Sequence, residues 1–148
     1  MPYWRLFYHI VWATRGRDAL LDESAGRIVE RSIRATCKTC DVVVHAVSVM
    51  PDHMHLVVSI SPSTAVSMLI GRVKGASSHV LRHPPDEPGI ESFAWQAEYG
   101  VLSFGEQALP DVVAYVENQR ERHAAQRLWD NLEQVADPSQ PASAGIAG

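Results

Sequence analysis

One alternating segment, Val49 to Ile60, constrains the fold of this 148-residue chain more than any other. Two histidines, His53 and His55, are two residues apart in it, and in a β-strand such residues point to the same face about 7 Å apart. The segment therefore predicts a strand with a pair of imidazoles on one face and an apolar opposite face. The apolar face would consist of Met54, Leu56, Val58 and Ile60.

Two imidazoles at this spacing can converge on one divalent metal ion, and they can equally be hydrogen-bonded histidines of an ordinary sheet. The pair does not complete a metal site, because a divalent ion takes at least a third protein ligand or several waters. A metal site at His53 and His55 therefore requires a third ligand from elsewhere in the chain.

Length, composition and charge indicate one globular domain. Hydrophobic residues make up 46% of the chain, and no apolar run approaches the roughly 20 residues that span a bilayer. The N-terminus lacks the order of a secretory signal, so we expect a cytoplasmic protein with no membrane partner. A net charge of −4 argues against nonspecific coating of nucleic acid, although residues 1–90 hold 10 basic against 8 acidic residues, which leaves room for a local basic face.

The two cysteines, Cys37 and Cys40, form a Cys-x-x-Cys motif, which is typical of half a zinc site or of a redox pair. The chain has no second cysteine pair. Both residues fall in a helical pattern, where positions i and i+3 share a face. A small buried helical face is therefore the favoured interpretation.

The expected order of elements is strand, helix, strand, strand, helix, strand and a third helix. The first six match the split β-α-β plan: an α+β, ferredoxin-like (RRM-like) antiparallel sheet with two helices on one face. In that plan the first strand and the histidine strand are central. The expected strands are 3–14, 42–49, 53–60 and, as one interrupted strand or a hairpin, 93–96 with 99–104; the expected helices are 22–40, 63–82 and 110–132, within a domain of residues 1–134 and before a disordered tail at 135–148.

The third helix carries Tyr115 and Gln119, which are four residues apart and therefore project from one helix face. This spacing pairs a potential nucleophile with a potential oxygen ligand. A tyrosine oxygen can attack a phosphodiester while a cation neutralises charge on the phosphate. The alternative is that Tyr115 packs at the rim of the helix and Gln119 is merely solvated.

Taken together, these features resemble the HUH-type single-tyrosine transposases of the insertion-sequence 200/605 group and their domesticated relatives, in which U is a hydrophobic residue, here Met54. The resemblance covers roughly residues 3 to 127, and it rests on an ordered set of motifs. These are Tyr8-His9-Ile10-Val11-Trp12-Ala13-Thr14, Met50-Pro51-Asp52-His53-Met54-His55-Leu56, Lys74-Gly75-Ala76-Ser77-Ser78, Trp95-Gln96 with Tyr99-Gly100, and Tyr115-Val116-Glu117-Asn118-Gln119.

The resemblance implies that His53, His55 and Gln119 hold Mg²⁺ or Mn²⁺ and that Tyr115 attacks a phosphate of single-stranded DNA, leaving a 5′-phosphotyrosine and a free 3′-OH. It also implies that Lys74 contacts the nucleic acid. Such proteins recognise hairpins at element ends and work as homodimers, in which the tyrosine helix of one subunit can complete the site of the other. Because Mg²⁺ prefers carboxylate and water ligands, we expect weak metal binding until DNA supplies a phosphate. This function would place the protein at the nucleoid.

Three other functions fit parts of the pattern. A relaxase or replication initiator uses the same histidine pair and tyrosine but tends to be larger than 148 residues. A ferredoxin-like sheet can also bind RNA by stacking bases on exposed aromatic residues, without catalysis. A domesticated relative would nick repeat hairpins without mobilising its own gene, and only the flanking DNA would distinguish it.

Overall fold

A computed structural model describes residues 3–119 of the chain, which fold into a four-stranded antiparallel sheet with helices on both faces. Between the strands and the three α-helices are two short 3-10 helices. The elements are β1 (Phe7–Ala13), η1 (Arg15–Arg17), α1 (Glu23–Thr39), β2 (Val43–Val49), β3 (His53–Ser59), α2 (Val66–Arg82), β4 (Gly100–Phe104), η2 (Glu106–Ala108) and α3 (Leu109–Glu117).

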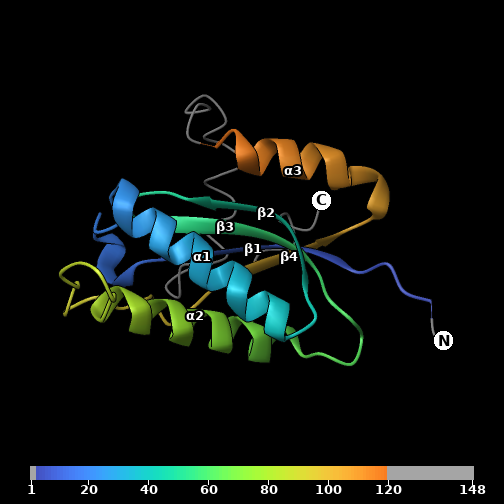
Figure 1. Ribbon diagram of the computed structural model, residues 1–148. Coiled ribbons are helices and arrows are strands. Elements are labelled where there is room, and N and C mark those ends of the chain that lie inside the picture. Colours follow the sequence, from blue (N-terminus) through green and yellow to red (C-terminus); the bar gives the residue numbers. More distant parts are fainter. Residues whose placement is uncertain (1–2, 120–148) are drawn as a thin grey trace.

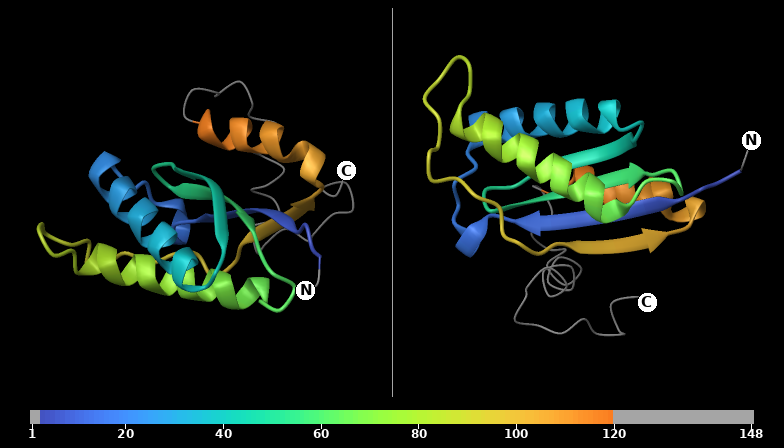
Figure 2. Two further views of the ribbon diagram at one scale, coloured as in Figure 1. Left: turned by 45° about the vertical axis from the view of Figure 1, so that its right-hand side comes forward. Right: turned by 90° about the horizontal axis from the view of Figure 1, so that it is seen from below.

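The strand order β2-β3-β1-β4 confirms the predicted ferredoxin-like arrangement. β1 and β3 are the central pair, and β2 and β3 form the predicted hairpin. Figures 1 and 2 show α1 and α2 side by side on one face of the sheet, with α3 on the other face. The sheet therefore has a helical layer on each side, and the two sides bury different kinds of residue.

The main core lies between the sheet and the α1/α2 layer. The alternation of the histidine strand places Met54, Leu56, Val58 and Ile60 in this core, each at most 1% exposed, which confirms the predicted apolar face. α1 begins where predicted, because the Asp22 carboxylate caps it by accepting a hydrogen bond of 2.8 Å from the amide of Ala25.

The Cys-x-x-Cys motif belongs to the packing of α1. Cys37 is fully buried on the core side of the helix and Cys40 caps its C-terminal end, both with free thiols. Burial, together with the neighbouring Cys40, raises the pKa of the Cys37 thiol to about 11. Since the thiolate is the reactive form, this environment disfavours redox chemistry and supports the interpretation as a buried helical face.

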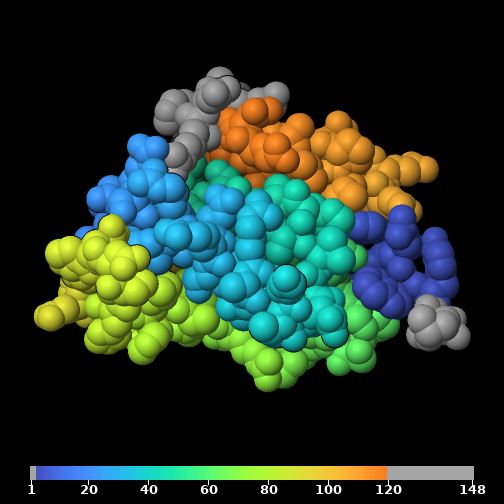
Figure 3. All heavy atoms as spheres, viewed as in Figure 1, coloured from blue at the N-terminus to red at the C-terminus, as the bar shows by residue number. Residues whose placement is uncertain are grey.

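The second face of the sheet is covered by α3, which buries β3 on both sides. Val116 of α3 is fully buried against Ala46 of β2 and Val57 of β3. Figure 3 shows α3 lying directly against the strand region. All seven residues of β3 are therefore buried, whereas the alternating sequence predicts a strand with only one buried face.

α3 is shorter than the predicted helix over 110–132. It ends at Glu117, and Asn118 and Gln119 form a turn, so the expectation of a continuous helix through Gln119 is wrong. The predicted continuation to residue 132 and the predicted tail at 135–148 lie outside the described residues. Within residues 3–119, no helix is both long and apolar enough to cross a membrane.

The last strand confirms the predicted interruption. Trp95 pairs with Thr14 at the end of β1, and pairing resumes with Gly100 opposite Val11. Regular antiparallel pairing would put position 98 opposite Val11, so two extra residues (100 − 98) are accommodated between Gln96 and Gly100. The edge strand therefore contains a β-bulge, close to the end of β1 at which Ala13 is opposite His53.

The burial of β3 on its core side can be tested by comparing substitutions at two methionines. Met54→Ala should lower the free energy of unfolding by about 2–5 kcal/mol, because it empties a fully buried position. Met68→Ala on α2 is the matched control, since Met68 is 49% exposed and its change should stay within about 0.5 kcal/mol. Urea titrations measure both, and equal losses would contradict the assigned core.

Candidate active site

The histidine pair lies on the α3 side of the sheet and has a third histidine beside it. His53 is 7% exposed and His55 is fully buried, with their ring centroids 5.4 Å apart. His9 of β1 is also buried, and its Nε2 lies 2.9 Å from Nδ1 of His55. The register explains the contact: Val11 is directly opposite His55, so His9 is the diagonal neighbour on the same face.

His53 has an equivalent partner in the residue before it. Its Nδ1 lies 2.5 Å from Oδ1 of Asp52, and the other oxygen of Asp52 accepts a hydrogen bond of 3.1 Å from Arg17. Both His53 and His55 therefore use Nδ1 for a protein contact. Metal-binding histidines are usually oriented in this way through one ring nitrogen, so Nε2 of each ring is the atom that a metal ion would bind.

Burial keeps these imidazoles neutral near pH 7. Desolvation lowers the pKa of His9 to about 4 and that of His53 to about 4, the latter in spite of the nearby Asp52 carboxylate. Burial lowers the pKa of His55 well below its ordinary value, and charge on His9 or His53 would lower it further. The contact between His53 and Asp52 is therefore a hydrogen bond that the neutral ring donates through Nδ1–H to the carboxylate at pH 7, rather than an ion pair.

α3 brings Tyr115 over the histidines of its own chain. The Tyr115 ring centroid is 6.1 Å from that of His55 and 6.2 Å from that of His9, in edge-on contacts. Pro110 stands in the first turn of α3, and Val116 anchors the helix to the sheet. The predicted nucleophile thus meets one of the predicted metal ligands, His55, within one chain.

Gln119 lies in the turn that follows α3. Its amide donates a backbone hydrogen bond of 3.2 Å to the carbonyl of Val116, and the residue is 7% exposed. Its side-chain Oε1 is buried and has no hydrogen-bond partner among the described residues. An amide oxygen buried in this way fits a metal ligand, because a buried polar atom without a partner is costly.

Two imidazoles and an amide oxygen are donors that suit a divalent cation, and none of the three carries a negative charge. Among residues 3–119 no group of three or more His, Cys, Asp or Glu side chains is arranged to hold a metal ion. A metal at this site would have His53, His55 and the Gln119 amide as protein ligands, all of them neutral. It would need further oxygen ligands from water or from a bound anion.

Lys74 lies on the opposite side of the sheet, on α2, and the structure does not bring it to the histidines. Its ammonium donates hydrogen bonds to the carbonyls of Gln96 at 2.6 Å, Glu98 at 3.1 Å and Ala97 at 3.4 Å. Burial lowers its pKa, and the charge of Glu98 opposes this shift. Its predicted contact with nucleic acid stays a prediction.

The sequence interpretation did not single out His9 as a site residue. It occurs in the first-strand motif, but its neighbours in sequence are apolar, and only the register of β1 against β3 places it next to His55. One feature of the sequence points to His9: alternate residues of a strand share a face. His9 therefore lies on the same face as Val11, which is opposite His55.

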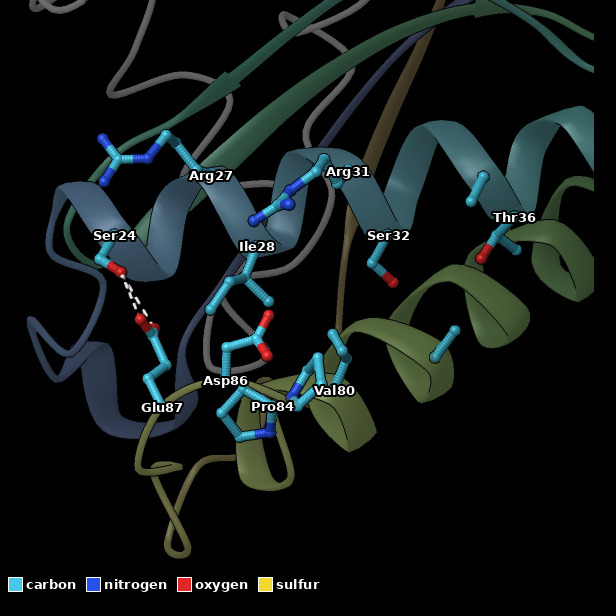
Figure 4. A pocket seen from close by; sticks show the side chains of 13 residues that line it. Ser24, Arg27, Ile28, Arg31, Ser32, Thr36, Val80, Pro84, Asp86 and Glu87 are labelled. Carbon is cyan, nitrogen blue, oxygen red and sulfur yellow. Dashed lines mark hydrogen bonds between the residues drawn. The ribbon is translucent and has the colours of Figure 1, made fainter.

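A cavity of about 600 Å³ lies away from this site, between α1 and α2. Arg27 and Arg31 of α1 line it, together with Asp86 and Glu87 of the loop after α2. Ser24 donates a hydrogen bond of 3.0 Å to Glu87 (Figure 4). None of the predicted site residues lines it. The predicted site residues His53, His55 and Tyr115 lie instead where α3 packs on the sheet.

Comparisons with known proteins place the chain near transposases. The sequence profile described as "Transposase IS200 like" matches residues 2–119. The ISDra2 transposase TnpA of Deinococcus radiodurans is 25% identical over 122 residues, which cover 80% of this chain and 87% of that protein. The transposase for insertion sequence element IS200 of Salmonella typhimurium is 32% identical over 78 residues, 53% of this chain and 51% of that protein.

Two solved structures share the fold. A candidate transposase from Deinococcus radiodurans R1 has a TM-score of 0.61 and 26% identity, and the match covers 80% of this chain and 93% of that one. A REP-associated tyrosine transposase bound to a REP hairpin has a TM-score of 0.64 and 14% identity, with coverage of 100% and 94%.

The neutral histidines predict a pH dependence of stability. The pKa of His9 is near 6.5 in the unfolded chain and about 4 in the folded one, so the unfolded state binds more protons as the pH falls through this window. Between pH 7.5 and 5, His9 alone should remove about 2 kcal/mol from the free energy of unfolding. His9→Gln, which can still bond to His55 but cannot titrate, should show a correspondingly smaller loss.

Urea titrations in EDTA at the two pH values measure this difference. The control is His83→Gln, because His83 is exposed and its replacement should leave the wild-type pH dependence unchanged. An identical loss of stability in wild type and His9→Gln would show that His9 is not held neutral by burial.

Proposed function

The chain belongs to the family of IS200-like transposases, and on that premise we propose that it cleaves and rejoins single-stranded DNA through a covalent bond to Tyr115. In this proposal His53, His55 and Gln119 hold a divalent ion, Mg²⁺ or Mn²⁺. The observation that carries the proposal is the contact between the Tyr115 and His55 rings, 6.1 Å between centroids. This contact supports the proposal because it sets the Tyr115 ring beside an imidazole whose Nδ1 is already in contact with His9.

The chemistry follows from the groups present. When bound, the metal ion supplies positive charge to a non-bridging oxygen of the scissile phosphate. The Tyr115 oxygen attacks phosphorus and loses its proton, the bond from phosphorus to the 3′ oxygen breaks, and that oxygen takes up a proton. The products are a 5′-phosphotyrosine and a free 3′-OH, and attack by another 3′-OH reverses the step.

The surrounding residues would each have a defined part. His9 and Asp52 hold the rings of His55 and His53 through Nδ1, which leaves Nε2 of each ring as the atom that would bind the metal. The packing of Val116 on Ala46 and Val57 holds α3, and with it Tyr115, against the sheet. Because the three protein ligands are neutral, the DNA phosphate would supply the negative charge that the cation needs.

We extend the proposal to the partner DNA. One solved relative with this fold is bound to a REP hairpin, and we propose a hairpin-bearing single strand as the substrate here. A domesticated relative that nicks hairpins would use the same residues. The RNA-binding alternative is disfavoured, because the sheet face that would stack bases is covered by α3 and its central residues Val11, His55 and Val57 are at most 1% exposed.

The first test is covalent capture. Tyr115→Phe should form no adduct with a single-stranded DNA hairpin in Mg²⁺, because phenylalanine lacks the attacking oxygen, while noncovalent binding to the same DNA is retained. The control Tyr3→Phe, at a residue 86% exposed, should form the adduct as wild type does. EDTA should also abolish it. Denaturing gels detect the adduct, and its formation by Tyr115→Phe would refute the assigned nucleophile.

The second test asks which subunit supplies the tyrosine in the homodimer that we include in the proposal. Tyr115 contacts His55 of its own chain, which supports a site formed by one subunit. A mixture of Tyr115→Phe and His55→Ala subunits should therefore form no adduct. If the mixture regains activity, as a mixed dimer with a shared tyrosine helix would, the contact seen within one chain is not the catalytic arrangement.

A further inference from the structure

The bulge between Gln96 and Gly100 is held by one half-buried cation, the ammonium of Lys74. At the bulge the carbonyls of Gln96, Ala97 and Glu98 turn toward Lys74, whose ammonium donates to all three. A lysine ammonium has three donors and no acceptor, so this contact uses its full capacity. Its charge also lies over the rings of Trp12 and Tyr99, at 5.9 and 5.8 Å from their centroids.

The bulge determines the face on which Gln96 projects. Trp95 points to the helical side, where its Nε1 donates a hydrogen bond of 2.9 Å to Ser77 of α2. Gln96 is the next residue of the paired segment, and its amide donates to the carbonyl of Ala13 at 2.9 Å. Because successive residues of a strand point to opposite faces, the Gln96 side chain lies on the histidine face.

Gln96 and His53 belong to one row across the sheet. Ala13 is opposite Gln96 on one side and opposite His53 on the other. The only side chain between them in that row is the methyl group of Ala13. A DNA phosphate at His53 would therefore have the partly buried Gln96 carboxamide two strands away in the same row.

We propose that Gln96 binds the edge of a nucleobase next to the scissile phosphate and that Lys74 is its positioning residue, acting through the bulge rather than on the DNA. This inference rests on the proposed function in one respect, that the substrate is single-stranded DNA. A carboxamide presents a donor and an acceptor together, which matches base edges, and unpaired strands expose these edges. Bulges next to active sites commonly re-aim a side chain in this way.

The test compares base preference between variants made in a Tyr115→Phe background, where binding does not depend on cleavage. The probe is a pool of DNA hairpins with a randomised single-stranded tail, and the bound strands are sequenced. Gln96→Ala should lose roughly tenfold or more of the discrimination at one tail position and keep the rest. Gln107→Ala, an exposed glutamine on η2, is the matched control and should keep every preference.

Three results of this comparison are decisive. Unchanged preferences in Gln96→Ala overturn the proposal. A parent protein that binds the pool without any base preference also overturns it and leaves the cleavage by Tyr115 standing. A parent protein that does not bind the pool overturns both. Adduct formation by the protein with Tyr115 intact is scored separately.

The part of Lys74 is tested by Lys74→Met. It should lose discrimination at the same tail position as Gln96→Ala, and the double variant should lose no more than Gln96→Ala alone. Hydrogen exchange at the Gln96 amide should quicken as its bond to Ala13 loosens. Lys74 would instead bind the DNA backbone if Lys74→Met binds all sequences more weakly and keeps every base preference. The slope of affinity against salt concentration would then fall by the amount of about one phosphate contact. If Lys74→Met does not fold, Gln96→Ala still decides the proposal.

Discussion

The packing of α3 against the sheet is the interaction on which the site depends. Val116 is fully buried on Ala46 and Val57, and this contact turns an otherwise open sheet face into an interior. Without it, His9 and His55 would be solvated imidazoles of ordinary pKa. With it, they are neutral, oriented by each other and in contact with Tyr115. The apolar contact thus produces both the geometry and the electrostatics of the cluster.

Burial under α3 also explains why an acidic protein can suit DNA. The carboxylate in direct contact with the described cluster is Asp52, and the charge of Arg17 faces it at 3.1 Å. Burial alone would raise the pKa of Asp52, but its bonds to His53 and Arg17 lower it, so it stays ionised and locally compensated. The carboxylate beside the histidine cluster thus adds little uncompensated negative charge to the site.

Local patterns predicted most of the fold and part of the site. The strand with His53 and His55, the apolar face of β3 and the cap at Asp22 depend on residues close together in sequence, and each was predicted. The partnership of His9 with His55 depends on strand register, which periodicity does not specify. The end of α3 at Glu117 was not predicted either, because no glycine or proline follows it closely in the sequence.

Both edges of the sheet carry an irregularity, and this has a consequence for how copies of the chain meet. β4 is a five-residue edge whose extension is broken by the bulge at 97–99, and β2 on the other edge shifts register between Val44 and Ala46. Regular edges offer rows of unpaired amides and carbonyls to any passing strand. Here each edge allows only a short stretch of added pairing, which protects the sheet from open-ended assembly while the protein is concentrated on DNA.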